Sequence, residues 1–108
     1  MLNLHIRPVA AKDIDEIIDY FVLKNTQTAQ DFVSELERCF TLLAENPQIG
    51  VQREYRPKAL AGMSMFPLKT FSSYLVFYMA DDQTIDIVRA LNGRRDIERL
   101  FTEKKGNP

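Results

Sequence analysis

The apolar residues of this sequence follow two different spacings, and the change between them limits the folds open to the chain. From about Ala10 to Asn46 they recur every three or four residues, which predicts amphipathic helices. From Met63 to Asn92 they form short runs between turn residues, which predicts strands. The helical positions are Ile14, Ile17, Ile18, Phe21 and Val22, then Ala29, Phe32, Val33, Leu36, Phe40 and Leu43.

Polar residues set the expected ends of the two helices. Lys24 and Asn25 suit the end of the first helix, and Thr26 or Thr28 can cap the second. Asn46–Pro47 ends the second helix, because a residue before proline disfavours the helical conformation. The connection between them is so short that we expect an antiparallel hairpin.

Strands are expected on both sides of this hairpin. Residues 3–9 form a short edge strand, and residues 63–71, 72–80 and 84–92 form three more, the last two joined by a turn at 81–83. Residues 47–62 read as an irregular connection. In the last strand we expect one face to carry Ile85, Ile87, Arg89 and Leu91, and the other Asp86, Val88 and Ala90.

The predicted fold is therefore α+β within one domain over residues 1–108. An N-terminal strand precedes the antiparallel helical hairpin, and a three-stranded antiparallel meander completes one sheet. Gly93 ends the last strand, and Asp96 can cap a short C-terminal helix with Ile97, Leu100 and Phe101. Residues 102–108 are expected to be a flexible tail.

Charge and cysteine content narrow the classes of function. Residues 1–46 carry four Lys/Arg against eight Asp/Glu, whereas residues 47–108 carry ten against seven. Such a bipolar chain favours specific contacts over nonspecific nucleic-acid binding. The lone cysteine, Cys39, suits a reducing cytoplasm and, beside Leu36 and Phe40, a buried structural role. We expect no signal peptide and no membrane span.

The last strand leads into adjacent cations, Arg94 and Arg95. Together with Arg89 and Arg99 they are the candidate contacts to a target or an antitoxin. The alternative is that Arg94, Arg95 and Arg99 form surface ion pairs with Asp96, Glu98 and Asp86, worth roughly 0–1 kcal/mol each. Arg89 is expected to have a structural or antitoxin-facing role, because its side chain is predicted to share a strand face with apolar residues.

Residues for catalysis or for a cofactor are not evident. No Cys/His spacing suits zinc and no glycine-rich loop suits a phosphate, so we expect no metal, cofactor or catalytic residue. His5 reads as a surface residue of the edge strand. Ser72 and Ser73 read as polar loop residues. The carboxylates of the first helix, Asp13, Asp15, Glu16 and Asp19, read as a solvated face.

Five segments in order resemble the ParE branch of the RelE/ParE toxins. They are residues 10–17 (AAKDIDEI), 42–50 (LLAENPQIG), 66–68 (FPL), 74–78 (YLVFY) and 87–97 (IVRALNGRRDI). One position departs from the pattern, since Asn92 stands where the family usually has histidine. The resemblance implies a four-stranded antiparallel sheet packed on the hairpin, and an antitoxin encoded beside the toxin that wraps across both.

The resemblance implies a toxin of a type II toxin–antitoxin system. ParE toxins inhibit DNA gyrase, whereas RelE relatives cut messenger RNA on the ribosome. RNA cleavage needs a general base and acid, and no Tyr or His follows Tyr78. Arginine stays protonated and serves poorly as a base. We therefore expect a gyrase inhibitor neutralised by a ParD-like ribbon-helix-helix antitoxin, without sequence-specific DNA binding of its own. A RelE-like endonuclease and a degenerate antitoxin-binding module are the alternatives.

Overall fold

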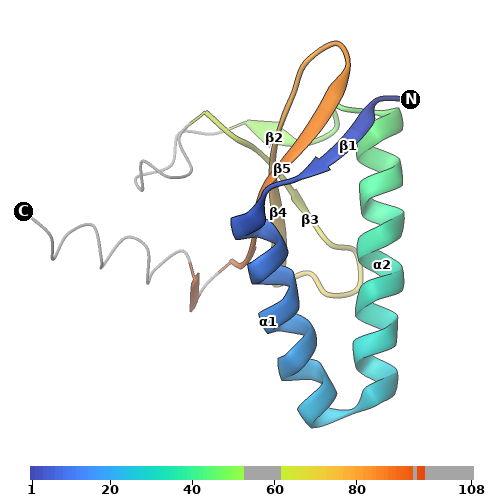
Figure 1. Ribbon diagram of the computed structural model, residues 1–108, viewed down its shortest axis with the longest axis vertical. Coiled ribbons are helices and arrows are strands. Elements are labelled where there is room, and N and C mark those ends of the chain that lie inside the picture. The colour runs from blue at the N-terminus through green and yellow to red at the C-terminus, as the bar shows by residue number, and fades with distance from the viewer. Residues whose placement is uncertain (53–61, 94, 97–108) are drawn as a thin grey trace, which may run out of the picture.

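The computed structural model describes residues 1–52, 62–93, 95 and 96 (Figure 1). A helical hairpin covers one face of a five-stranded sheet whose strand order is β1-β5-β4-β3-β2. The elements are β1 (Asn3–Ile6), α1 (Pro8–Lys24), α2 (Thr26–Glu45), β2 (Val51–Gln52), β3 (Ser64–Pro67), β4 (Tyr74–Ala80) and β5 (Thr84–Asn92). The expected α+β fold with an antiparallel hairpin is confirmed.

The two helices begin earlier than their apolar spacing suggests. Pro8 occupies the first turn of α1, where its missing N–H needs no partner, so β1 ends at Ile6 rather than at residue 9. The expectation that Thr26 or Thr28 caps α2 is wrong. The side chain of Asn25 accepts the N–H groups of Gln27 and Thr28 at 2.8 and 3.2 Å, so one residue ends α1 and starts α2.

The sheet is mixed, which corrects the expected antiparallel arrangement. β1 lies at the edge, as expected, but it runs parallel to β5, with Asn3 opposite Thr84. The connection after α2 contains a further strand, β2, which pairs with β3 at two positions. Pro67 limits the extension of β2 before Val51. The N–H of Leu68 donates to β4, so the backbone nitrogen of position 67 faces the opposite side, toward β2. Because that residue is proline, it has no N–H to donate to an extended β2.

A β-bulge in β5 overturns the predicted division of its faces. Phe77 pairs with Arg89 and Tyr78 pairs with Ile87, which leaves Val88 as the extra residue. Beyond the bulge the alternation is shifted by one residue. Ala90 therefore packs under the helices with Ile85 and Ile87, whereas Leu91 packs on the opposite face with Val88.

The core lies between the hairpin and the sheet. Four rings from both helices and the β3–β4 region, those of Phe21, Phe32, Phe71 and Tyr74, meet with centroids 5.3–5.7 Å apart. Cys39 belongs to this core, which confirms its expected burial, and burial raises the pKa of its thiol to about 12. β4 is covered on both faces, as predicted, since Phe77 belongs to a second buried cluster on the far face.

Candidate partner-binding site

Arg89 is held near the end of β5 by Asp13 of α1. Nε and Nη2 of Arg89 donate to the two carboxylate oxygens of Asp13 at 2.7 and 3.0 Å. The same carboxylate accepts the backbone N–H of Ala90 at 3.1 Å. Because β1 pairs with β5 only as far as Ile87, Asp13 occupies the strand edge just beyond it. Asp13 is therefore not part of a solvated face: only 11% of its side chain is exposed.

The chain turns after β5 through a pair of reciprocal hydrogen bonds. The side chain of Asn92 accepts the N–H of Arg95 at 3.1 Å, and the carboxylate of Asp96 accepts the N–H of Asn92 at 2.7 Å. Asn92, rather than Asp96, is the residue that caps the following helical turn, so that expectation is corrected. Residues 95 and 96 are helical, and the rest of the expected C-terminal helix and tail lies outside the described residues.

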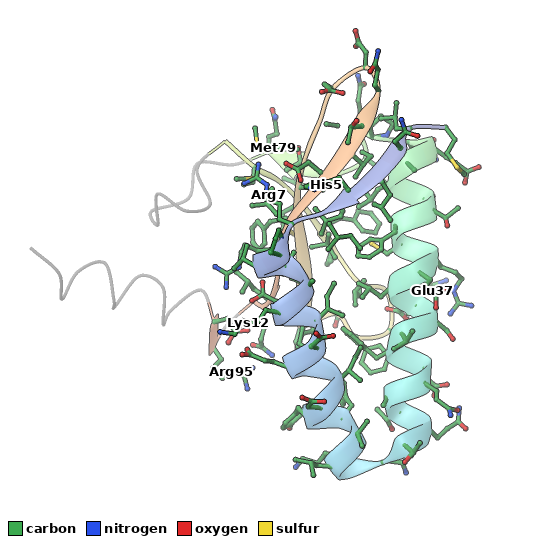
Figure 2. All side chains as sticks on the ribbon, viewed as in Figure 1. His5, Arg7, Lys12, Glu37, Met79 and Arg95 are labelled. Carbon is green, nitrogen blue, oxygen red and sulfur yellow. The ribbon has the colours of Figure 1, made fainter. Side chains whose placement is uncertain are left out.

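This turn presents Arg95 to solvent. Its Nε donates to the buried carboxylate of Asp96 at 3.0 Å, and 62% of the Arg95 side chain stays exposed. The hydrogen bond and charge of Asp96 raise the pKa of Arg95, so the guanidinium stays protonated. Figure 2 shows Arg95 and Lys12 toward one margin of the view, with Glu37 of α2 at the other. The other two candidate cations, Arg94 and Arg99, lie outside the described residues.

A cleft of about 330 Å³ opens beside Arg95, between α1 and the ends of β4 and β5. It is lined by Asp13, Glu16, Ile17, Tyr20, Tyr74, Ala90, Leu91, Arg95 and Asp96. Among the described lining residues, three carboxylates accompany one cation, Arg95, although the sequence suggested a cationic surface. Tyrosine and carboxylate groups suit contacts to protein side chains, whereas the carboxylates oppose the approach of a phosphate.

A second polar cluster joins β1 to β5 on the sheet. Nδ1 of His5 donates to Asp86 at 2.9 Å, and Nε and Nη2 of Arg7 contact the other carboxylate oxygen at 2.9 and 2.7 Å. Figure 2 shows His5, Arg7 and Met79 in the same part of the view. His5 is exposed and lies on the edge strand, as expected, but its contact with Asp86 was not predicted. The cluster fastens the short edge strand to its neighbour.

This cluster should make stability depend on pH in acid. Burial alone would raise the pKa of Asp86, but the hydrogen bonds from Arg7 and His5 outweigh it and lower the pKa. A carboxyl whose folded pKa is depressed stabilises the fold above its unfolded pKa, about 4, and loses this contribution as pH falls through the folded value. Replacing Asp86 by asparagine should lower the unfolding free energy by about 1 kcal/mol at pH 7.

Urea titrations at pH 7 and pH 3 check this. The difference between Asp86→Asn and the unaltered chain should shrink at pH 3. An Asp82→Asn variant is the control, because that exposed turn residue contacts neither His5 nor Arg7 in the described structure. A difference that stays constant between the two pH values would contradict the assignment.

The described residues form neither a cluster suited to a metal ion nor a helix suited to a membrane span. Among residues 1–52, 62–93, 95 and 96, no three His, Cys, Asp or Glu side chains gather as they would around a metal ion. None of the described helices is both long and apolar enough to cross a membrane.

Comparison with known proteins decides the family. The family described as "ParE toxin of type II toxin-antitoxin system, parDE" matches residues 4–97. The chain belongs to the ParE toxin family. A chain of the "Chromosomal ParDE TA system from P. aeruginosa" is similar in structure, with a TM-score of 0.67 and 22% identity over 85% of this chain and 96% of that one. An identity this low supports the fold alone. No curated protein matches the sequence.

Four of the five segments that resemble ParE toxins meet in two pairs in this fold. Asp13 of residues 10–17 holds Arg89 of residues 87–97. The hydroxyl of Tyr78, from residues 74–78, donates to the carbonyl of Pro47 and accepts the N–H of Gly50, both from residues 42–50. Glu16, Tyr20 and Tyr74 of the cleft were missed as site residues. The only signal for them was that Glu16 and Tyr74 fall inside these segments.

Proposed function

We propose that this ParE-family chain is a toxin that arrests growth by binding DNA gyrase and not by catalysis. A ParD-like ribbon-helix-helix antitoxin neutralises it. In this proposal Arg95 contacts the partner from the rim of the cleft, and Arg94 and Arg99 belong to the same cationic segment. Arg89 has an indirect role: its ion pair with Asp13 fastens β5 to α1, and the cationic segment follows β5.

The chemistry of the cleft carries this proposal. A ribonuclease site would need an imidazole or another base beside a cation that accepts the phosphate. Among the described residues, the cleft beside Arg95 is lined by the carboxylates of Asp96 and Glu16 together with two phenols. The one histidine, His5, is hydrogen-bonded to Asp86 in the β1 cluster and does not line the cleft. These groups favour a protein partner over an RNA backbone.

Purified protein tests the proposal directly. It should inhibit supercoiling by gyrase and leave ribosome-bound messenger RNA uncut. Cleavage of that RNA with supercoiling intact would assign the chain to the RelE mode of action. Expression without the antitoxin tests the remaining alternative, a degenerate antitoxin-binding module, because such a module would not stop growth.

Replacing Arg95 by alanine should weaken gyrase inhibition about tenfold, because exposed arginines at the centre of protein contacts often contribute more than 1 kcal/mol. The measurement is the toxin concentration that halves supercoiling. Lys24→Ala is the control, since Lys24 is an exposed cation at the far end of α1. If both variants inhibit as strongly as the unaltered chain, Arg95 is no part of the contact. Thermal melting of each variant confirms that the fold is retained.

A further inference from the structure

The cleft beside Arg95 contains a buried hydroxyl group whose hydrogen bonds are not used within the described structure. Tyr74 is 9% exposed, and its ring packs in the aromatic part of the main core. A tyrosine hydroxyl buried to this degree usually has a hydrogen-bond partner. The hydroxyl of Tyr78, on the same strand, bonds two backbone groups. The hydroxyl of Tyr74 makes no hydrogen bond with any residue that the structure describes.

This hydroxyl lies on the side of the ring that faces the cleft. Tyr74 lines the cleft together with Arg95. The hydrogen bond and charge of Asp96 are the main causes of the raised pKa of Arg95, and the phenol group of Tyr74 adds to them. An effect of this kind falls off with distance, so the phenol oxygen is near the guanidinium of Arg95. The hydroxyl of Tyr74 is therefore available to a group that enters the cleft.

One carboxylate of the cleft is also available to a ligand. Two of the three lining carboxylates are each paired with an arginine, at 2.7 and 3.0 Å. The third, Glu16, is exposed and makes no ion pair with another described residue, including Lys12 one turn before it. Lys24 lies over the ring of Tyr20, with Nζ 5.3 Å from the ring centroid, but it does not line the cleft. The cleft therefore offers an uncompensated negative charge beside an unused hydroxyl.

These groups suit a guanidinium better than an anion. A guanidinium has five N–H donors in a planar fork, so it can donate to the carboxylate of Glu16 and to the hydroxyl oxygen of Tyr74 together. The aromatic ring of Tyr20 adds a surface on which the cation can stack. The cleft volume of about 330 Å³ is near the lower limit of roughly 300–1,000 Å³ for ligand pockets. It therefore suits one long side chain and not a helix.

We propose that this cleft binds an arginine side chain of the protein target, an inference that rests on the proposed function. Glu16 pairs with the guanidinium, and the hydroxyl of Tyr74 accepts one of its N–H groups. Arg95, held by Asp96, contacts the target from the rim of the cleft. The contact is then reciprocal, because each protein supplies an arginine to the other.

Two conservative substitutions remove these groups separately. Glu16→Gln removes the charge, and Tyr74→Phe removes only the hydroxyl. Asp19→Asn is the matched control, because this exposed carboxylate lies on the same helix but does not line the cleft. Tyr74→Phe should unfold at the same temperature as the unaltered chain or at a higher one, because it removes a buried polar group that has no partner. A lower unfolding temperature would show that the hydroxyl is already bonded and would contradict the proposal.

Direct binding is measured by NMR with three capped amino acids: the N-acetyl amides of arginine, glutamine and glutamate. The arginine compound should shift the resonances of Glu16 and Tyr74, whereas the neutral glutamine compound and the anionic glutamate compound should not. Its affinity should fall about tenfold in Glu16→Gln and about fivefold in Tyr74→Phe, since a hydrogen bond to a charged group contributes more than one between neutral groups. Equal binding of the arginine and glutamine compounds, or a preference for the glutamate compound, would overturn the proposal.

Supercoiling assays separate this inference from the proposed function. The toxin concentration that halves supercoiling should rise about tenfold for Glu16→Gln and about fivefold for Tyr74→Phe, and stay unchanged for Asp19→Asn. If both cleft variants inhibit gyrase as strongly as the unaltered chain, or if Asp19→Asn loses as much, the inference is wrong and the proposed function stands. If the unaltered chain binds the arginine compound in the cleft but does not inhibit gyrase, the arginine site stands and the gyrase assignment is wrong.

Discussion

Replacing Asp13 by alanine should lower the free energy of unfolding by about 3 kcal/mol, because it removes a carboxylate that pairs with a mostly buried arginine. Only 18% of the Arg89 side chain is exposed, and its Nε and Nη2 both donate to Asp13. The backbone N–H of Ala90 would lose its carboxylate acceptor as well. For a chain of this size, the midpoint of thermal unfolding should fall by about 15 °C.

Urea unfolding measures the change, and the same helix supplies the control. Asp15 is exposed, so Asp15→Ala should alter stability by no more than about 0.5 kcal/mol. The double variant Asp13→Leu, Arg89→Met removes both charges and should be more stable than Asp13→Ala alone. Equal unfolding midpoints for Asp13→Ala and Asp15→Ala would show that the ion pair does not fasten α1 to β5.

The helical hairpin and the β3–β4–β5 meander could be predicted because each depends on residues close together in the sequence. The apolar spacing identified both helices, and Asn46–Pro47 marked where α2 ends. The parallel pairing of β1 with β5 could not be predicted in this way. It depends on how the chain crosses the sheet between positions 81 residues apart, such as His5 and Asp86.

The bulge in β5 shows a second limit of sequence reasoning. Alternation along one strand predicts its faces only while each residue has one partner on the neighbouring strand. Val88 is the extra residue only because of how β5 pairs with β4, and the β5 sequence alone does not indicate it. The predicted face of Ile85 and Ile87 was therefore right, and that of Leu91 was wrong.

The candidate site was predictable in part. The arginines drew attention to the end of β5, where Arg95 is exposed, but their surroundings come from distant segments. Asp13 looked like one of several solvated carboxylates because a helix sequence does not show which strand lies beside it. Its position in a ParE-like segment was the available signal. The contacts of Asp13 with Arg89 and of Tyr78 with Gly50 give a structural role to residues in four of those segments.

The second of these pairings leads to the other large expected effect. A Cβ atom added at Gly50 would lie 2.3 Å from the hydroxyl oxygen of Tyr78 and 2.7 Å from its ring. The ring cannot move away easily, since Tyr78 is 1% exposed and packs in the main core. Gly50→Ala should therefore destabilise the fold by about 3 kcal/mol, through overpacking and loss of the hydrogen bond from its N–H.

Gly62 supplies the contrasting glycine for this test. It has a positive φ of 76° but nothing within 4 Å of an added Cβ, so Gly62→Ala should cost only about 1–2 kcal/mol of backbone strain. Tyrosine ionisation followed by NMR gives an independent check. Burial raises the pKa of Tyr78, so a ring displaced by Gly50→Ala should ionise at lower pH than in the unaltered chain. If Gly50→Ala is no less stable than Gly62→Ala and Tyr78 titrates unchanged, residues 47–50 can shift to accommodate the added methyl group. The Tyr78 hydroxyl would then not hold these residues in place.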